Sequence, residues 1–368
     1  MPGTGYDQDE MSRHDPGTRR ATISDVAREA GVSPSTASVV FSRKTPVSDA
    51  TRRRVLDAAA ALGYTGPDPR AASLRRGRSG IVGVVFEEHL GRAFLDPVKT
   101  LMMDGLADAV APLGAGLLLL RDHEPVASDA TATGPSLTTA PLDAAVLIGC
   151  SGLLRESLEA VKARGIPVVV IEGDAGDEVP RIDLDNREAQ RQIASHLRAL
   201  GHRRVAVVAL PARVDWERGW LRDDTAITVD VTRDRLAGAL DVFPDAAAYA
   251  AAGSFIDEGF AAGREIFADA DRRPTAVLAQ SDLLAAGVIR AAEEAGLRVP
   301  EDVSVTGFDG IVVDGLAPYE LTTAVQPATD KGRAAGAAVA AMLEGRPAAS
   351  IRFTCTFREG NTSGPAPE

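Results

Sequence analysis

Short apolar runs that alternate with helical patterns, beginning at Gly80, constrain the fold more than any other feature of this sequence. The runs are continuously apolar, which indicates strands buried on both faces, as in parallel sheets covered by helices. The predicted strands are Ile81–Phe86, Gly116–Leu120, Ala144–Gly149, Pro167–Ile171, Arg204–Ala209, Ala276–Ala279, Val303–Gly307 and Leu321–Gln326. The helices predicted between them include Leu95–Leu113, Leu153–Arg164, Asn186–Leu200, Asp257–Asp269 and Asp282–Ala295. Such sheets bind ligands at the carboxyl ends of their strands, although many enzymes share the pattern.

The segment before Gly80 carries start and stop signals for short helices. Thr22 can cap the first helix, and Gly31 follows it where helices commonly end. Ser33 can cap the second, whose first position, Pro34, needs no backbone N–H. The predicted helices are Ile23–Ala30, Ser35–Phe41 and Asp49–Leu62. Two short helices joined by a tight turn at glycine favour a helix-turn-helix over a generic helical hairpin.

Helical spacing separates the two faces of this segment. The side chains expected in its small core are Val26, Ala27, Val32, Ala37, Val40 and Val55. The side chains expected to face outward, on the helix that would enter a DNA major groove, are Ser35, Thr36, Ser38 and Val39.

Charge is distributed unevenly along the chain. The whole chain has a formal net charge of −12, yet residues 19–79 carry +7 and the residues from 80 onward carry −16. A small basic module joined to a large acidic body is expected when one end meets DNA phosphates and the other stays away from them.

Several classes of protein are excluded by what the sequence lacks. It has no apolar run of about 18 residues that could span a membrane. Residues 1–20 have no apolar signal segment, so we expect a disordered tail on a cytoplasmic protein. No catalytic motif or metal-ligand spacing is recognisable, so we expect no enzyme activity, no cofactor and no metal.

Three stretches near the N-terminus resemble the LacI/GalR-type bacterial transcription regulators: TISDVAREAGVSPSTAS, PVSDATRRRVLDAAAALGY and AASLRRGRSG. Later stretches continue the resemblance, among them IDLDNREA, LRALGHRRVAVV, QSDLLAAG and LTTAVQP. The resemblance implies an N-terminal all-α helix-turn-helix headpiece and an α/β periplasmic-binding-protein-like core of two parallel-sheet subdomains. The expected parts are a tail at 1–20, a headpiece at 21–66, a hinge at 67–79 and a core at 80–368. Within the core we expect an N-subdomain at about 80–184 and 312–344 and a C-subdomain at about 185–311 and 345–368.

The resemblance also implies which residues contact DNA. These are Thr22, Ser33, Ser35, Thr36, Ser38, Val39, Ser42, Ala71 and Leu74. Val39 stands where the family usually has arginine, and Ser42 replaces the usual asparagine. Since arginine is the commonest side chain to contact guanine, we expect a changed or relaxed operator sequence. In the hinge, Leu74 matches an apolar wedge for the minor groove, although Ala72 and one extra residue depart from the family pattern.

Four residues match effector contacts of the family. Arg235 would reach the ligand from a helix, or instead form a surface ion pair. Asp282 would accept hydrogen bonds from ligand hydroxyls, cap the helix that follows, or do both. Phe255 would stack on a flat ligand face or pack in the core. Phe94 matches a loop aromatic, although HLGRAFLDP departs from the common pattern.

Three more side chains have open assignments. Trp216 and Trp220 would stack on a sugar ring or anchor a loop, and Asp309 would face the cleft or stabilise a turn. Together these features predict a homodimeric regulator, a repressor, that binds double-stranded operator DNA. Its operator affinity would respond to a small-molecule effector, a sugar or sugar derivative. The alternatives are a nucleoside or purine effector, and a cytosolic sugar-binding α/β protein without a DNA role.

Overall fold

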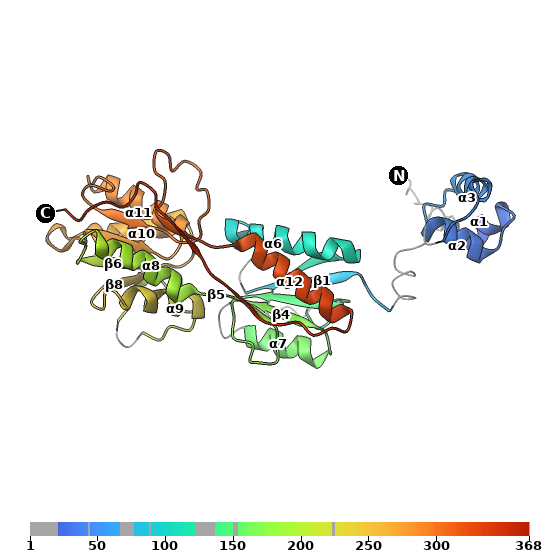
Figure 1. Cartoon of the computed structure of the whole chain (residues 1–368), viewed down its shortest axis with the longest axis horizontal. Coiled ribbons are helices and arrows are strands. Elements are labelled where there is room, and N and C mark those ends of the chain that lie inside the picture. Colours follow the sequence, from blue (N-terminus) through green and yellow to red (C-terminus); the bar gives the residue numbers. More distant parts are fainter. Residues whose placement is uncertain are drawn as a thin grey trace, which may run out of the picture. The chain divides into compact units, whose positions relative to one another are not determined.

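The computed structural model falls into two compact units, Met1–Ser79 and Gly80–Glu368. The residues that it describes are 21–42, 45–66, 77–87, 90–121, 137–149, 154–222 and 225–367. The described part of the first unit is a three-helix headpiece, and the second, the core unit, consists of two α/β lobes (Figure 1). Among the described residues, no helix is both long enough and apolar enough to cross a lipid bilayer.

The headpiece helices begin where the sequence predicted them. Thr22 caps α1 by accepting a hydrogen bond from the Asp25 backbone N–H, and the Asp25 side chain accepts one from Thr22 in return. Ser33 Oγ accepts from the Thr36 backbone N–H at 3.1 Å, and Ser48 caps the third helix. The helices are α1 (Ile23–Glu29), α2 (Pro34–Ser42) and α3 (Asp49–Ala61).

A small apolar core holds these three helices together. Its buried members are Val26, Ala27, Ala30, Ala37, Val40, Val55, Ala58 and Ala59. The predicted core is confirmed apart from Val32, which is only partly buried at the turn. Phe41 and Tyr64 close one side of this core with an edge-to-face contact at 5.3 Å between ring centres.

The first lobe is an all-parallel six-stranded sheet in the order β12-β5-β4-β3-β1-β2. Helices α6 and α12 pack together on one face and α7 covers the other (Figure 1). The strands are β1 (Ile81–Phe86), β2 (Gly116–Arg121), β3 (Ala144–Ile148), β4 (Val168–Ile171), β5 (Arg181–Leu184) and β12 (Ile351–Phe353). The helices are α5 (Leu90–Ala93), α6 (Pro97–Val110), α7 (Leu154–Ala163) and α12 (Ala328–Leu343), with a 3₁₀ turn at Ala111–Leu113.

The second lobe is a five-stranded sheet in the order β10-β9-β6-β8-β7, parallel except for β7. Helices α10 and α11 cover one face, and α8 and α9 cover the other. The strands are β6 (Val205–Ala209), β7 (Gly219–Trp220), β8 (Ala247–Ala250), β9 (Ala276–Ala279) and β10 (Ser304–Thr306). The helices are α8 (Asn186–Ala199), α9 (Asp230–Leu240), α10 (Ile256–Phe267) and α11 (Asp282–Glu294), with a 3₁₀ turn at Ala270–Arg272.

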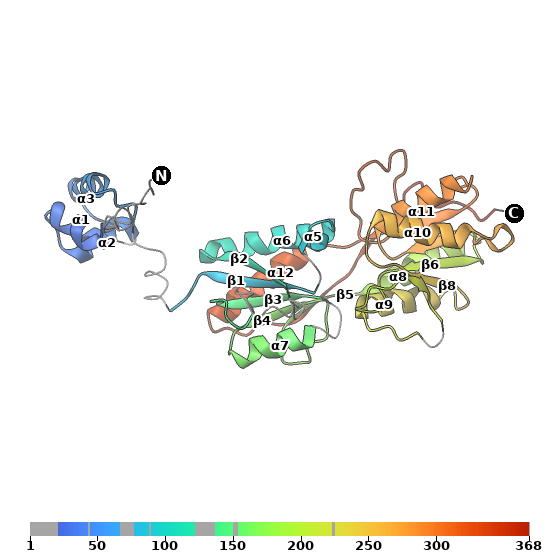
Figure 2. The ribbon, with the colours of Figure 1, turned by 180° about the vertical axis from the view of Figure 1, so that it is seen from behind.

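The chain passes from one lobe to the other between β5 and α8, between β11 and α12, and between β12 and β13 (Figure 2). Strands β11 (Thr323–Val325) and β13 (Thr356–Arg358) pair antiparallel as a separate ribbon beside the second lobe. All eight predicted strands are present with ends within two residues. The prediction did not name β5, β7, β8, β12 and β13, nor helices α5, α9 and α12.

The expected subdomain boundaries need correction near the C-terminus. We expected 345–368 in the C-subdomain, but Ile351 to Phe353 pair with β5 in the first sheet. We expected 312–344 in the N-subdomain, but Thr323 to Val325 pair with β13 beside the second lobe. The reason is that strands of three residues show no periodicity from which their partners could be predicted.

Two glycines let α6 and α12 approach closely. A Cβ added to Gly332 would lie 1.9 Å from the Met102 carbonyl oxygen, and one added to Gly105 would lie 2.0 Å from that of Thr329. Both obstacles are backbone atoms of the facing helix, so a side-chain rotation cannot relieve either contact. These helices are therefore held at a separation that only glycine permits.

Gly332→Ala should lower the free energy of unfolding of the core by about 1–3 kcal/mol or more, because the added methyl forces the helices apart. Denaturant unfolding of the full chain measures this. Gly91→Ala is the matched control, since nothing lies within 4 Å of its added Cβ. Equal stability of the two variants would contradict the close approach of α6 and α12.

Candidate functional site

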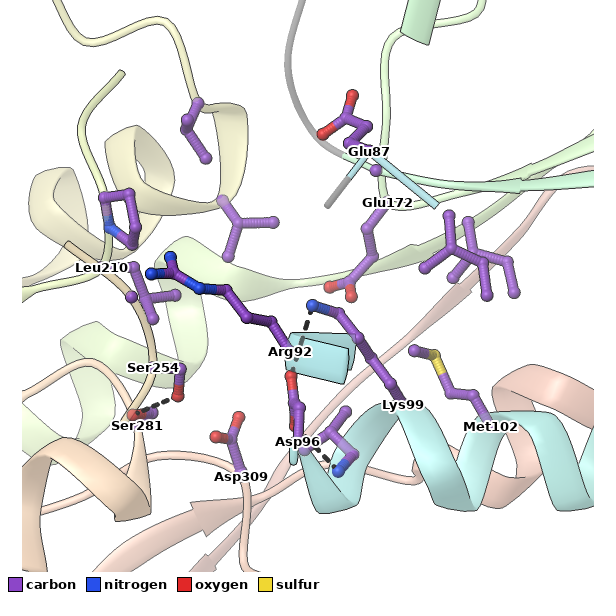
Figure 3. A pocket seen from close by; sticks show the side chains of 18 of the residues that line it. Glu87, Arg92, Asp96, Lys99, Met102, Glu172, Leu210, Ser254, Ser281 and Asp309 are labelled. Carbon is purple, nitrogen blue, oxygen red and sulfur yellow. Dashed lines mark hydrogen bonds and ion pairs between the residues drawn. The ribbon is translucent and has the colours of Figure 1, made fainter. Parts of the chain in front are cut away.

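A cavity of about 160 Å³ lies between the two lobes of the core unit, beyond the carboxyl ends of their parallel strands (Figure 3). Glu87, Gly149 and Glu172 directly follow β1, β3 and β4 of the first lobe. Leu210 and Ser281, which follow β6 and β9, line it from the second lobe. The fold therefore places the cavity where parallel α/β sheets usually bind ligands.

The two walls of the cavity differ in chemistry. The first lobe contributes charged side chains, among them Arg92 of α5 and Asp96 and Lys99 at the start of α6, and Figure 3 shows them pointing into the cavity. The Lys99 ammonium lies 3.5 Å from the Asp96 carboxylate. The second lobe contributes mainly apolar side chains, namely Leu210, Pro211, Val214, Trp216, Val229, Val231 and Phe255. A ligand that fits this cavity needs both polar groups and an apolar surface.

Phe255 and Arg92 contact each other across the cavity. The Arg92 guanidinium carbon lies 5.5 Å from the centre of the Phe255 ring, within the range of a cation–π interaction. Phe255 is the residue before α10, and its ring contacts the face of Gly253, where a Cβ would lie 2.4 Å from the ring. The aromatic ring is therefore fixed at the second-lobe wall.

Six polar side chains form a closed ring of hydrogen bonds and ion pairs along one side of the cavity. In the part of the ring nearest the first lobe, Lys331 Nζ donates to Glu172 Oε2 at 2.8 Å and to Gln326 Oε1 at 2.6 Å. Asn186 Nδ2 donates to the other Glu172 oxygen, Oε1, at 3.2 Å. These bonds join α12 and β4 of the first lobe to α8 of the second.

The rest of the ring lies in the second lobe. Arg235 Nε donates to Asn186 Oδ1 at 2.9 Å, and its Nη1 lies 3.5 Å from Asp309 Oδ1. Gln326 Nε2 donates to the same Asp309 oxygen at 2.7 Å, which closes the ring. Two basic and two acidic side chains are thus linked through two amides.

Burial makes this ring sensitive to the loss of any member. The Lys331 side chain is fully buried and that of Glu172 is 15% exposed. Burial raises the pKa of Glu172, but the charges of Lys331 and Arg235 outweigh it and hold that pKa below its usual value. Burial raises the pKa of Asp309 well above its usual value, with Arg235 opposing the shift and nearby Asp282 adding to it.

The predicted effector residues divide into two groups. Arg235 and Phe255 line the cavity, as do Asp309 and Trp216, two of the residues with open assignments. Phe94 is 50% exposed and does not line the cavity, because its neighbours Arg92 and Asp96 occupy the wall in its place. Trp220 likewise lies outside, 42% exposed and in edge-to-face contact with Tyr249.

Asp282 also lies outside the cavity. It is fully buried, where its Oδ1 accepts from Thr323 Oγ1 at 2.6 Å and its Oδ2 accepts from the Ile311 backbone N–H at 2.8 Å. Gly307 leaves room for the Asp282 carboxylate in this position, since a Cβ at Gly307 would lie 2.1 Å from Asp282 Oδ1. The expected cap was wrong by one residue: Ser281 caps α11 and also lines the cavity. Asp282 is therefore not among the side chains that line this cavity.

The sequence did not single out most of the charged residues of this site. Glu87 and Glu172 could have been found, because each follows a predicted strand at its carboxyl end. Asn186 and Gln326 fell within recognised stretches but carried no signal of their role. Lys331 gave no signal at all, since it lies in an alanine- and glycine-rich helix as an ordinary polar residue would.

The second candidate site is the outward face of α2 in the headpiece. Ser33 Oγ lies 2.8 Å from both Ser35 Oγ and Thr36 Oγ1, so these three hydroxyls form one cluster at the start of the helix. Ser42 Oγ donates to the Val39 carbonyl oxygen at 3.2 Å. The expected hinge contacts, Ala71 and Leu74, lie outside the described residues.

Two family descriptions match this chain: "Bacterial regulatory proteins, lacI family" at residues 22–66 and "Periplasmic binding protein-like domain" at residues 194–362. An HTH-type transcriptional regulator of Mycolicibacterium smegmatis is 33% identical over 379 residues, which cover 96% of this chain and 99% of that protein. The chain belongs to the lacI family of bacterial regulatory proteins.

Solved structures of lacI-family regulators share the fold. The Lac repressor dimer bound to operator and the anti-inducer ONPF has a TM-score of 0.74 at 23% identity, covering 94% of this chain and 100% of that one. The complex of the transcriptional regulator CelR with cellobiose has a TM-score of 0.65 at 24% identity, covering 93% and 100%. The expected headpiece and periplasmic-binding-protein-like core are thus confirmed.

As a member of this family, the chain is a DNA-binding transcription regulator with a ligand-binding core, and its relatives are regulators rather than enzymes. The ring of polar residues beside the cavity lies in that ligand-binding core. Its stability contribution can be measured without knowing the ligand.

Lys331→Met should lower the free energy of unfolding by about 3–5 kcal/mol, because it leaves Glu172 buried without its cation. Adding Glu172→Gln to this variant should restore part of the loss, since the uncompensated charge is then removed. Lys99→Met is the matched control in the same cavity, and we expect a loss below about 1 kcal/mol for its partly exposed ion pair. Urea unfolding that gave equal losses for Lys331→Met and Lys99→Met would contradict a buried, charge-compensated ring.

Proposed function

We propose that this protein is a repressor that binds operator DNA as a homodimer. Its affinity for the operator falls or rises when a carbohydrate occupies the cavity. The observation that carries the proposal is that the cavity is lined by both lobes at once. A ligand that contacts both lobes stabilises one angle between them over another. The polar ring and three chain crossings join the lobes. A change in the angle between the lobes can therefore change the operator affinity of the DNA-binding unit.

The chemistry of the cavity walls supports a carbohydrate. A sugar ring has hydroxyl groups around its edge and apolar C–H groups on its faces. The charged first-lobe wall offers partners for hydroxyls, and Trp216 and Phe255 offer aromatic faces for the C–H groups. A cavity of about 160 Å³ has room for roughly five waters at about 30 Å³ each, which suits one sugar ring better than a chain of them. The cellobiose complex of a structural neighbour agrees with this class of ligand.

The proposed DNA contacts lie on the headpiece and the hinge. They are Thr22, Ser33, Ser35, Thr36, Ser38, Val39, Ser42, Ala71 and Leu74. The exposed hydroxyls at the starts of α1 and α2 suit phosphate oxygens, which fix the position of a headpiece without selecting a sequence. A basic segment at 19–79 with a net charge of +7 supplies the electrostatic attraction.

Exposed apolar side chains on the first lobe support a homodimer. Leu95 is 65% exposed, Leu101 is 41% exposed and Val312 is 85% exposed. Ile311 belongs to the apolar core around α6, and Val313 packs against the cores of both lobes, so Val312 lies beside the first lobe as well as the second. Burial of these side chains against a second copy would remove apolar surface from water.

Tryptophan fluorescence tests the position of the effector, because Trp216 and Trp220 are the two tryptophans of the chain. A panel of monosaccharides, disaccharides and nucleosides is first screened by thermal shift. The ligand found should change the emission of the native protein and of Trp220→Phe, because Trp216 lines the cavity. The change should disappear in Trp216→Phe. A ligand-induced emission change that depended on Trp220 instead would place the ligand outside the cavity. If the ligand found were a nucleoside, the proposed class of effector would be nucleosides and not carbohydrates.

Charge substitutions test the homodimer. Leu95→Glu and Val312→Glu should shift the chain from dimer to monomer in sedimentation at micromolar concentration, and should weaken operator binding at least tenfold. Ile351→Glu is the matched control, since Ile351 is 42% exposed on β12, at the sheet edge opposite β2. Dimers of unchanged stability in both variants would show that these side chains are not in the interface.

A further inference from the structure

The outward face of α2 has an unusual composition for a helix that contacts DNA bases. Ala37 and Val40 are buried in the headpiece core. Since successive helix residues are about 100° apart, the opposite face presents Ser35, Val39 and Ser42, with Ser38 beside them. Val39 is partly exposed and is the one apolar side chain on that face of the nine-residue helix.

No residue of α2 can make a charged or two-point contact with a base. Its sequence, PSTASVVFS, contains no arginine, lysine, asparagine, glutamine or acid. A serine or threonine hydroxyl both donates and accepts, so it discriminates poorly between base edges. Two of the hydroxyls are also engaged with Ser33, and that of Ser42 donates to the Val39 carbonyl oxygen. Hydrogen bonding alone therefore gives this helix little sequence preference.

Val39 offers a different kind of contact. Its two methyl groups cannot satisfy a donor or an acceptor, so facing the N7 and O6 of guanine would desolvate those atoms without compensation. The thymine 5-methyl is the apolar group that a natural base pair presents in the major groove. We propose that Val39 contacts a thymine methyl at one position of each operator half-site and that this contact is the main source of base discrimination by α2. The proposal rests on operator binding by this helix.

Deoxyuridine substitution tests the proposal, because it removes the methyl group and leaves every hydrogen-bonding atom of the base pair unchanged. The full-length protein first selects its operator from a random duplex pool. Each thymine of the selected half-site is then replaced by deoxyuridine, one at a time. At one position, affinity should fall about fourfold, the effect expected for one CH₂-sized apolar group. The operator with 5-methylcytosine in place of that thymine should bind more tightly than the operator with cytosine there.

Variants connect the effect to the side chain. Val39→Ser should bind the thymine and deoxyuridine operators equally at that position, because it replaces the apolar methyl groups by a hydroxyl, whereas the outward-facing control Ser38→Ala should keep the fourfold difference. Circular dichroism of both variants shows whether the helices still form. Native protein that binds all deoxyuridine operators as tightly as the parent would overturn the proposal, and so would a preference that survives in Val39→Ser. Absence of any enriched sequence would overturn operator binding itself, which is a distinguishable result.

Discussion

A buried ring of two ion pairs and two amides is the interaction on which the rest of the core depends. It connects Glu172 and Lys331 of the first lobe to Asn186, Arg235 and Asp309 of the second through hydrogen bonds of 2.6–3.2 Å and one ion pair of 3.5 Å. An isolated buried charge is costly, so each member is stable there only while its partners stay in place. The ring also fixes uncommon backbone: Glu172 and Asp309 have φ values of 55° and 114°, and such conformations cost about 1–3 kcal/mol each.

In the proposed function, this arrangement lets a ligand between the lobes affect the DNA-binding unit. Four ring members, Glu172, Arg235, Asp309 and Gln326, also line the cavity. A ligand that hydrogen-bonds to any of them competes with a bond of the ring, because each of these side chains already donates to or accepts from another member. The ring therefore joins ligand recognition and the angle between the lobes in one set of side chains, which is what a coupling between two sites requires.

Local signals allowed the sequence to predict a large part of this fold. Caps at Thr22, Ser33 and Ser48 fixed the headpiece helices, and continuously apolar runs located eight of the strands. What escaped prediction depends on contacts between distant parts of the chain. Glu172 and Lys331 are 159 residues apart, and β12 has three residues whose pairing only the folded lobe determines. For the site, motif matching correctly brought Arg235 and Phe255 to the cavity, but it could not predict that Asp282 turns away toward Thr323.

The central claim is that a ligand in the cavity changes operator affinity. The direct test is to measure the operator dissociation constant of the full-length protein by fluorescence anisotropy, without ligand and with the ligand at saturation. Coupling energies of about 1–3 kcal/mol predict a change of about 5- to 150-fold, with ligand affinity changing by the same factor when operator is present. A ligand that saturates the cavity and leaves the operator dissociation constant unchanged would contradict the account.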